Sequence, residues 1–137
     1  MELFWHGLNH ICGGVAVVHR KTLSVKKLEC SHTMSFSSFE YLECKVKADG
    51  PEFIFVVVYR PPPSAKNGLK AHTFFEEWNI FFHKYSEVTC SIVLAGDIYF
   101  DLDVPKDTNT CHFKSILYCH GLKQHVDKPT HKKRSYA

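Results

Sequence analysis

The sequence predicts an α/β domain in which helices cover a sheet. Two short runs, residues 53–59 and 92–95, are continuously apolar and have the length of strands, the second with a composition that suits burial on both faces. Between them, residues 72–85 repeat aromatic side chains at helical spacing, as an amphipathic helix does. Because strands and a helix alternate along the chain, we expect helices packed against a sheet.

Length and composition fit one such domain. With 137 residues and 45% hydrophobic content, the chain can bury a core, which excludes a disordered protein. Eleven Phe, six Tyr and two Trp exceed what packing requires, so we expect some exposed aromatic surface, as in a fragment that lacks a partner surface. The net charge of +3 permits nucleic-acid contact without requiring it. The cations concentrate in residues 19–27 and 123–134.

The cysteine pattern and the apolar runs indicate the compartment. The six cysteines are scattered without a CxxC pair, so neither a zinc ribbon nor a disulfide framework is predicted. Glu2 and polar residues interrupt the N-terminal apolar stretch, which makes it a poor signal peptide. The run at 53–59 is too short to span a bilayer. We therefore expect a soluble intracellular protein, nuclear or cytoplasmic, with no membrane partner and no small-molecule cofactor; its oligomeric state is open.

The first quarter of the chain contains two predicted strands. Residues 1–12 have no clear period and are expected to be an irregular lead-in. GGVAVVHR at 13–20 joins a glycine pair to β-branched residues, which is typical of a strand entered by a close turn. Residues 21–27 alternate, with Leu23 and Val25 on one face, and predict a further strand.

A hairpin and a helix follow. FEYLECKV at 39–46 alternates between two faces, one of which carries Glu40, Leu42, Cys44 and Val46. The turn at 49–51 joins this strand to the strand at 53–59, so the two are expected to form a hairpin. Three consecutive prolines end the second strand, because proline lacks the amide hydrogen that a ladder needs.

The stretch SIVLAGDIYFDLD at 91–103 carries the most chemistry. Gly96 breaks its apolar run, and Asp97 then stands just past the C-terminal end of a strand, where α/β sheets bind ligands. Asp101 and Asp103 follow, so three carboxylates in one loop can attract a hard cation such as magnesium. The alternative is a solvated acidic turn that closes the strand.

The last third contains a second helix. Apolar residues at helical spacing predict a helix at 110–120, and Gly121 supplies its stop. Residues 124–126 are expected to form a short strand, and 128–131 a loop. The chain then stops after a basic tail, with no stretch left to complete a sheet, so we expect a fragment.

The helix at 110–120 also carries two Cys-His pairs. Cys111-His112 and Cys119-His120 lie about two turns apart and are rotated from one another. Buried cysteines and surface histidines are therefore favoured over a zinc site.

Several segments together resemble one family, the endonuclease/exonuclease/phosphatase domains, in this order: GGVAVVHR, FEYLECKV, VVVYRPPPS, the helix around FFEEW, IVLAGDIYFDLD, HGLKQHV and KPTH. The chain is most similar to the endonuclease part of LINE-type (non-LTR) retrotransposon polyproteins. The resemblance covers residues 13–131, and its specificity comes from the ordered set. It implies an incomplete two-sheet α/β sandwich of the DNase I-like type with outer helices, with a lead-in at 1–12 and a basic tail at 132–137.

The resemblance also implies a chemistry, a metal and a partner. Members of this family cleave phosphodiester bonds with a divalent cation, usually Mg²⁺, which makes DNA a candidate partner. Asp97 matches the aspartate of the family's GDFN motif, which positions or deprotonates the attacking water, and it is a weak metal-ligand candidate. Tyr59 matches the tyrosine near the phosphate, with a packing tyrosine as the alternative. Arg60, Thr130 and His131 match positions expected to bind substrate.

Departures from the family pattern predict little or no nuclease activity. The motif's asparagine is Tyr99 here, and the following histidine of many relatives is Asp101. Asp103 matches an aspartate that is more structural than catalytic. The early asparagine and glutamate of the family have no match before Gly13, and the terminal aspartates and histidine, including the SDH motif, fall beyond Ala137. Each missing group would contribute several kcal/mol of transition-state stabilisation, on the order of 3 kcal/mol.

Two other functions stay open. A binding module would keep weak DNA affinity through basic segments such as Lys132, Lys133 and Arg134, although a solvated tail explains these residues too. A protein-interaction remnant would use exposed aromatic side chains. In each case an incomplete second sheet leaves exposed strand edges, so we expect marginal stability and a tendency to aggregate.

Overall fold

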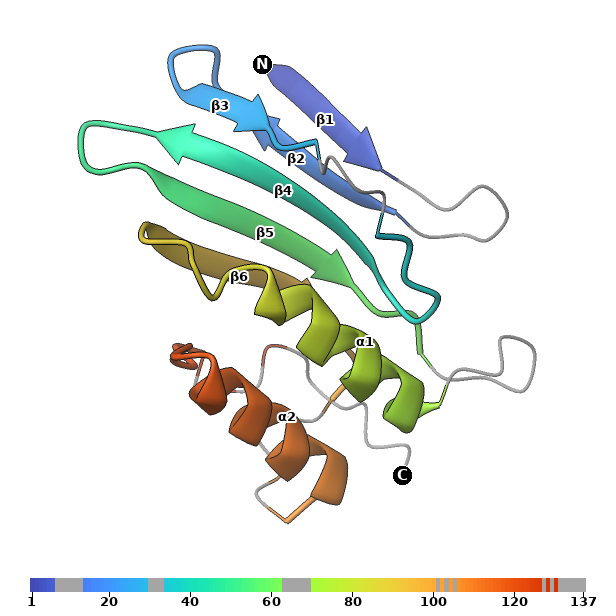
Figure 1. Ribbon diagram of the computed structural model, residues 1–137. Coiled ribbons are helices and arrows are strands. Elements are labelled where there is room, and N and C mark those ends of the chain that lie inside the picture. The colour runs from blue at the N-terminus through green and yellow to red at the C-terminus, as the bar shows by residue number, and fades with distance from the viewer. Residues whose placement is uncertain are drawn as a thin grey trace. The chain divides into compact units, whose positions relative to one another are not determined.

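The computed structural model describes residues 1–6, 14–29, 34–62, 70–100, 102, 104, 106–126, 128 and 130 of the chain (Figure 1). These fall into two compact units, 1–99 and 100–137. The first unit contains six strands and a helix: β1 (Glu2–His6), β2 (Val15–His19), β3 (Ser24–Lys27), β4 (Glu40–Lys47), β5 (Phe53–Tyr59), α1 (Ala71–His83) and β6 (Ser91–Asp97). The second contains α2 (Thr108–Cys119).

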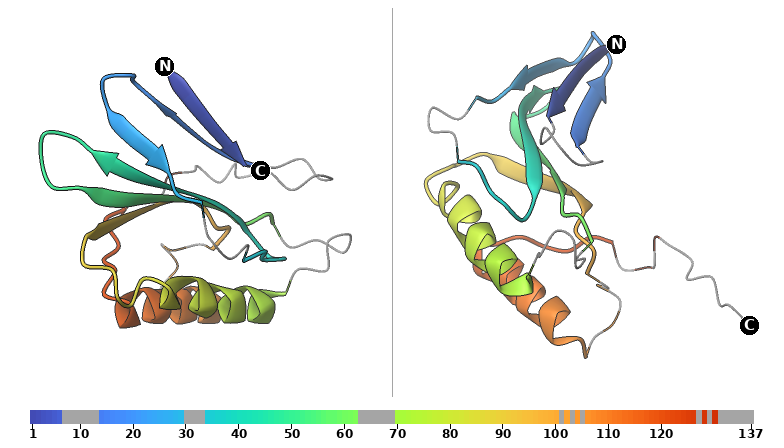
Figure 2. Two further views of the ribbon diagram at one scale, coloured as in Figure 1. Left: turned by 45° about the horizontal axis from the view of Figure 1, so that its top comes forward. Right: turned by 90° about the vertical axis from the view of Figure 1, so that its right-hand side faces the viewer.

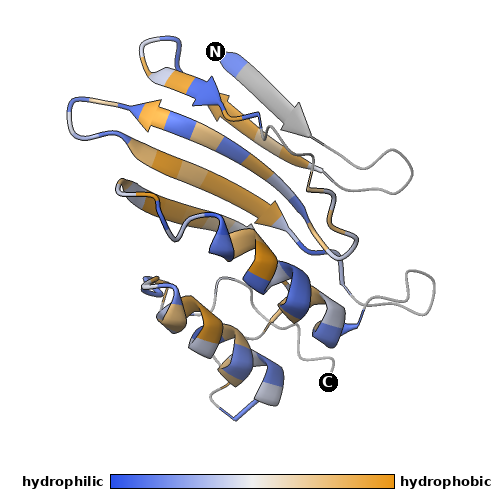
Figure 3. Ribbon diagram, viewed as in Figure 1, coloured by the Kyte–Doolittle hydropathy of each residue, from blue (hydrophilic) through white to orange (hydrophobic). Residues whose placement is uncertain are grey.

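The centre of the first unit is a four-stranded mixed sheet with the order β3-β4-β5-β6. β4 and β5 form the predicted antiparallel hairpin, and β6 lies parallel to β5. Parallel neighbours need a crossover connection, and α1 supplies it. Figure 3 shows the sequence basis: β5 is apolar along its length, whereas β4 alternates between hydrophilic and hydrophobic residues. The expected α/β architecture is confirmed at this level.

The aromatic side chains of α1 form the core on one side of this sheet. Its buried residues are Phe74, Phe75, Trp78, Phe81 and Phe82. The ring of Phe39, just before β4, lies 5.3 Å from Trp78 and 5.6 Å from Phe81, in edge-to-face geometry that aromatic pairs favour. These rings pack between helix and sheet, so the exposed aromatic surface that we expected is small among the described residues. Among the described residues, Tyr99 and Tyr118 are the large aromatic side chains that are well exposed.

A second, two-stranded sheet covers part of the opposite face. β1 and β2 pair antiparallel from Glu2↔His19 to His6↔Val15, and Figure 2 shows them on the side of the sheet opposite α1. Val15 and Val17 of β2 join Leu42 and Cys44 of β4 in one buried cluster. The irregular lead-in expected at 1–12 is thus wrong for residues 2–6. Three consecutive apolar residues in this segment conceal the alternation that marks a strand. The strand is stabilised by pairing with β2, which the local sequence pattern does not show.

β6 departs from its expected burial on both faces. Its side chains alternate between exposed and half-buried, and Val93 is 45% exposed. The physical reason is position: β6 is the last strand of the described sheet, and the β1–β2 pair packs over β4 and β5 instead. An apolar run alone does not distinguish a central strand from an edge strand.

In the second unit, α2 has a defined start and stop. The Asp107 carboxylate accepts a hydrogen bond from the Thr110 backbone N–H at 2.7 Å, an N-cap that lowers the pKa of Asp107. Gly121 adopts φ 71° after the last turn, as predicted for a helix stop. Residues 124–126 form no strand, which corrects the prediction for that segment. Cys111 and Cys119 are exposed, not buried.

Neither described helix is long and apolar enough to cross a membrane.

Candidate functional site

Three polar residues stand in register at one end of the four-stranded sheet. Glu40 is the partner of Tyr59 across the antiparallel β4–β5 pair, and Tyr59 is the partner of Asp97 across the parallel β5–β6 pair. Residues directly opposite one another in neighbouring strands share a face of the sheet. The row runs from buried Glu40 through half-buried Tyr59 to exposed Asp97. The structure therefore brings together the two residues that the resemblance placed at the reaction centre.

The backbone holds Asp97 in place. Gly96 adopts φ +146°, and the Arg60 backbone N–H donates to the Asp97 carbonyl oxygen at 2.8 Å. This bond continues the β5–β6 ladder by one step beyond Tyr59. Hydrogen bonds to β5 and to the Arg60 N–H therefore hold the backbone at Asp97, whose side chain is exposed.

A turn follows Asp97 at once. Its carboxylate oxygen Oδ1 accepts a hydrogen bond from the Tyr99 backbone N–H at 3.3 Å, as aspartates do in Asx turns. Tyr99 has φ 52°, in the left-handed region that favours glycine and asparagine, and its side chain is 51% exposed. The backbone at this position thus has the conformation that the family's asparagine tolerates and tyrosine resists.

Arg60 is buried, with 2% of its surface exposed. Its Nη1 donates to the Ile98 carbonyl oxygen at 3.2 Å, and its guanidinium carbon lies 5.0 Å from the centre of the Phe74 ring. Burial lowers the pKa of this guanidinium. These contacts tie the segment after β6 to α1, so Arg60 positions the Asp97 turn; direct contact with substrate stays a prediction.

The other predicted residues belong to the second unit or lie outside the described residues. Thr130 is exposed and belongs to the second unit. His131, Asp101 and Asp103 lie outside the described residues. Of the three carboxylates predicted for this loop, Asp97 is the one that the structure describes.

Glu40 is the residue that sequence reasoning missed. The alternating pattern already put this acid on the same face as the apolar Leu42, an unusual position for a carboxylate. The hairpin register then sets Glu40 beside Tyr59. The signal was present in the combination of face and hairpin, but the register was needed to connect it to Asp97.

Asp97 is the residue of the row whose exposed carboxylate could meet a metal ion. Among the described residues no three or more His, Cys, Asp or Glu side chains are grouped to hold a metal ion. Mg²⁺, however, is commonly bound by one or two carboxylates, with water and substrate phosphate as the remaining ligands. Asp97, as the exposed carboxylate, suits a cation that arrives with a phosphate, and the described residues do not suit a closed protein cage.

Comparisons with protein-family models, with curated proteins and with solved structures found no match to this chain. The functional interpretation therefore depends on its own residues and their geometry.

Proposed function

We propose that this chain is an endonuclease/exonuclease/phosphatase-type domain, related to LINE-type retrotransposon endonucleases, that has lost most or all catalytic activity. Its fold would then be part of a two-sheet sandwich of the DNase I-like type. Support comes from the mixed sheet with α1 on one face and the β1–β2 pair on the other. The observation that carries the proposal is the direct register of Tyr59 with Asp97.

In this proposal Asp97 and Tyr59 of the row, and the adjacent Arg60, have roles at a phosphodiester. The Asp97 carboxylate orients a water molecule for in-line attack or accepts its proton. The Tyr59 hydroxyl donates a hydrogen bond to a phosphate oxygen, where negative charge develops. Arg60 holds the turn that fixes Asp97. A bound Mg²⁺ would supply Lewis-acid polarisation of the phosphate.

The departure at Tyr99 is one of the departures from the family pattern that support the proposal of lost activity. A carboxamide at this position could donate a hydrogen bond to phosphate or ligate the cation. The tyrosine hydroxyl lies farther from the backbone than a carboxamide would and cannot make either contact with the same geometry. Loss of one preorganised donor of this kind typically costs about 3 kcal/mol, or roughly a hundredfold in rate.

A second candidate function is nucleic-acid binding without cleavage. It is favoured by exposed lysines on β3 and β4, far from the row of Glu40, Tyr59 and Asp97. A role as an aromatic interaction surface has less support, because Tyr99 and Tyr118 are the large aromatic side chains that are well exposed among the described residues.

The test is plasmid nicking with Mg²⁺ or Mn²⁺ by the wild-type chain and by Tyr99→Asn, with circular dichroism to show that both are folded. We expect no nicking by the wild type, and any nicking gained by Tyr99→Asn should disappear after a further Asp97→Asn change. Asp49→Asn, in an exposed turn, is the matched control and should leave that nicking intact. Wild-type nicking that requires Asp97 would overturn the loss of activity. Nicking that persists in Asp97→Asn would overturn the assignment of the site.

A further inference from the structure

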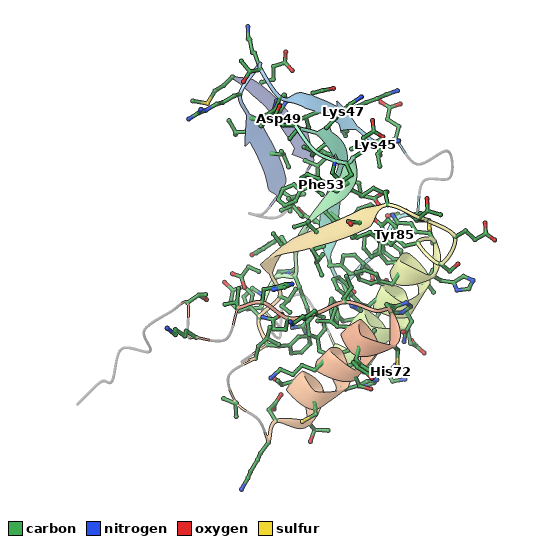
Figure 4. All side chains as sticks on the ribbon, turned by 90° about the vertical axis from the view of Figure 1, so that its left-hand side faces the viewer. Lys45, Lys47, Asp49, Phe53, His72 and Tyr85 are labelled. Atoms are coloured by element: carbon green, nitrogen blue, oxygen red, sulfur yellow. The ribbon has the colours of Figure 1, made fainter. Side chains whose placement is uncertain are left out.

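Three lysines gather on one face of the sheet at the β3–β4 corner. Lys26 of β3 is the direct cross-strand partner of Lys45 of β4, and Lys47 lies two residues farther along β4. Side chains two residues apart on a strand share a face, as do direct cross-strand partners. All three residues are exposed, and Figure 4 shows Lys45 and Lys47 at the same end of the sheet. We call these three residues the lysine face.

Few acidic groups balance this charge. Glu52 forms an ion pair with Lys45 at 3.1 Å, with both side chains nearly half exposed. Glu43, the acid on the same face of β4, is buried and already bonded to Lys84. Asp49 lies in the exposed turn after β4. Like charges directly opposite one another destabilise a sheet, so repulsion between Lys26 and Lys45 lowers the stability of the fold. An anionic partner bound at this place would reduce that repulsion.

The lysine face is separate from the candidate site. Lys45 is in register with Ile54 near the start of β5, whereas Tyr59 ends that strand. Five residues of strand at about 3.3 Å each separate the two positions by about 17 Å. The inference below therefore stands without the proposed nuclease relationship.

We propose that the lysine face binds the sugar-phosphate backbone of nucleic acid without reading its sequence. Lys45 and Lys47 are about 6.8 Å apart along the strand, and cross-strand partners are about 5 Å apart. A DNA strand presents phosphates every 3.4 Å or so along the helix axis, so the spacing of Lys45 and Lys47 matches about two phosphate steps. Lysine ammonium groups on flexible stems suit such contacts, which require charge and not a fixed angle.

The competing explanation is protection of an edge. β3 is the outer strand of the described sheet, and lysine on an edge strand discourages pairing with another chain. The two explanations differ in what they predict for DNA affinity, which protection of an edge leaves unchanged.

The experiment measures binding of the full chain to a fluorescent DNA duplex of random sequence by anisotropy, over a salt series and without divalent metal. The test variant is Lys26→Gln/Lys47→Gln, which leaves the Lys45–Glu52 pair intact. The matched control is Lys70→Gln/Lys106→Gln, which removes two exposed lysines that are not part of the lysine face. Thermal melting of each protein establishes that it is folded.

We expect the test variant to bind about tenfold more weakly at low salt, with the slope of log affinity against log salt reduced by about 1.8, or about 0.9 for each lost phosphate contact. The control should change both values much less. Equal changes in the two variants, or an unchanged slope, would overturn the proposal. Unchanged DNA affinity with self-association of the test variant would instead establish edge protection. Stronger binding to polyglutamate than to DNA would indicate an acidic protein as the partner.

Discussion

A Cβ atom on Gly96 would lie 1.8 Å from the carbonyl oxygen of Val58. The two residues are partners in the parallel β5–β6 pair, one step before Tyr59 and Asp97. The glycine of the Gly-Asp sequence is therefore required for β6 to approach β5 and for Asp97 to stand beside Tyr59. Its φ of +146° adds a second requirement for glycine.

We therefore predict that Gly96→Ala lowers the free energy of unfolding by at least about 2 kcal/mol, because the strands must separate to admit a methyl group. Urea denaturation measures the change. Gly50→Ala is the control, since no atom lies within 4 Å of the added Cβ there. Similar losses in the two variants would show that the close approach to Val58 is not what Gly96 supplies.

A substitution at Tyr99 is predicted to stabilise the fold, in contrast to Gly96→Ala. Its φ of 52° is costly for a residue with a bulky side chain and tolerable for asparagine. Tyr99→Asn should therefore raise the free energy of unfolding by about 1 kcal/mol. Tyr118→Asn, at an exposed position in α2, should lower it slightly through helix propensity. Destabilisation by Tyr99→Asn in urea would mean that the phenol makes a contact worth more than the strain.

The local sequence pattern predicted those elements whose structure follows from the periodicity of their own residues. Each of three elements reflects one periodicity of its sequence: the alternation of β4, the apolar run of β5 and the helical spacing of α1. The short turn between β4 and β5 allowed the hairpin to be predicted. β1 and the exposure of β6 depend instead on which strands lie beside them. That information is non-local, and a run of apolar letters does not contain it.

The residues of the candidate site likewise fall into those that the sequence predicts and those that only the structure reveals. Asp97 and Tyr59 were identified from the residues around them and from the family resemblance, but their adjacency depends on the register that the β5-α1-β6 crossover sets. Glu40 escaped notice because only the hairpin register places it beside Tyr59. Arg60 was expected to meet substrate, and its burial against Phe74 could not be predicted without the position of α1.

Two ion pairs on β4 should contribute unequally to stability. Glu43 accepts from Lys84 Nζ at 2.7 Å and from the Tyr85 hydroxyl, with its side chain 5% exposed. Lys45 and Glu52 are 3.1 Å apart but nearly half exposed. Breaking a buried pair leaves an uncompensated charge, which costs about 3 kcal/mol, whereas an exposed pair contributes less than about 1 kcal/mol.

Glu43→Gln and Glu52→Gln in urea denaturation test this difference. We expect the first variant to lose about 3 kcal/mol and the second less than about 1 kcal/mol. Adding Lys84→Met to Glu43→Gln should recover part of the loss, because the ammonium group that has lost its carboxylate is then removed as well. Equal effects of the two single variants would show that burial does not decide the strength of these pairs.

The Glu77 carboxylate should make stability depend on pH. Burial raises its pKa, but hydrogen bonds from the backbone and side chains of Ser37 and Ser38 outweigh burial and lower the pKa below its usual value. A lowered folded-state pKa stabilises the fold above the unfolded-state value of about 4.3, and that stabilisation disappears as pH falls through the folded-state pKa. The stability difference between wild type and Glu77→Gln should therefore be constant near pH 7 and shrink below about pH 5. Urea denaturation from pH 7 to pH 3, with exposed Glu87→Gln as control, measures it, and a difference that grows on acidification would contradict the assigned direction.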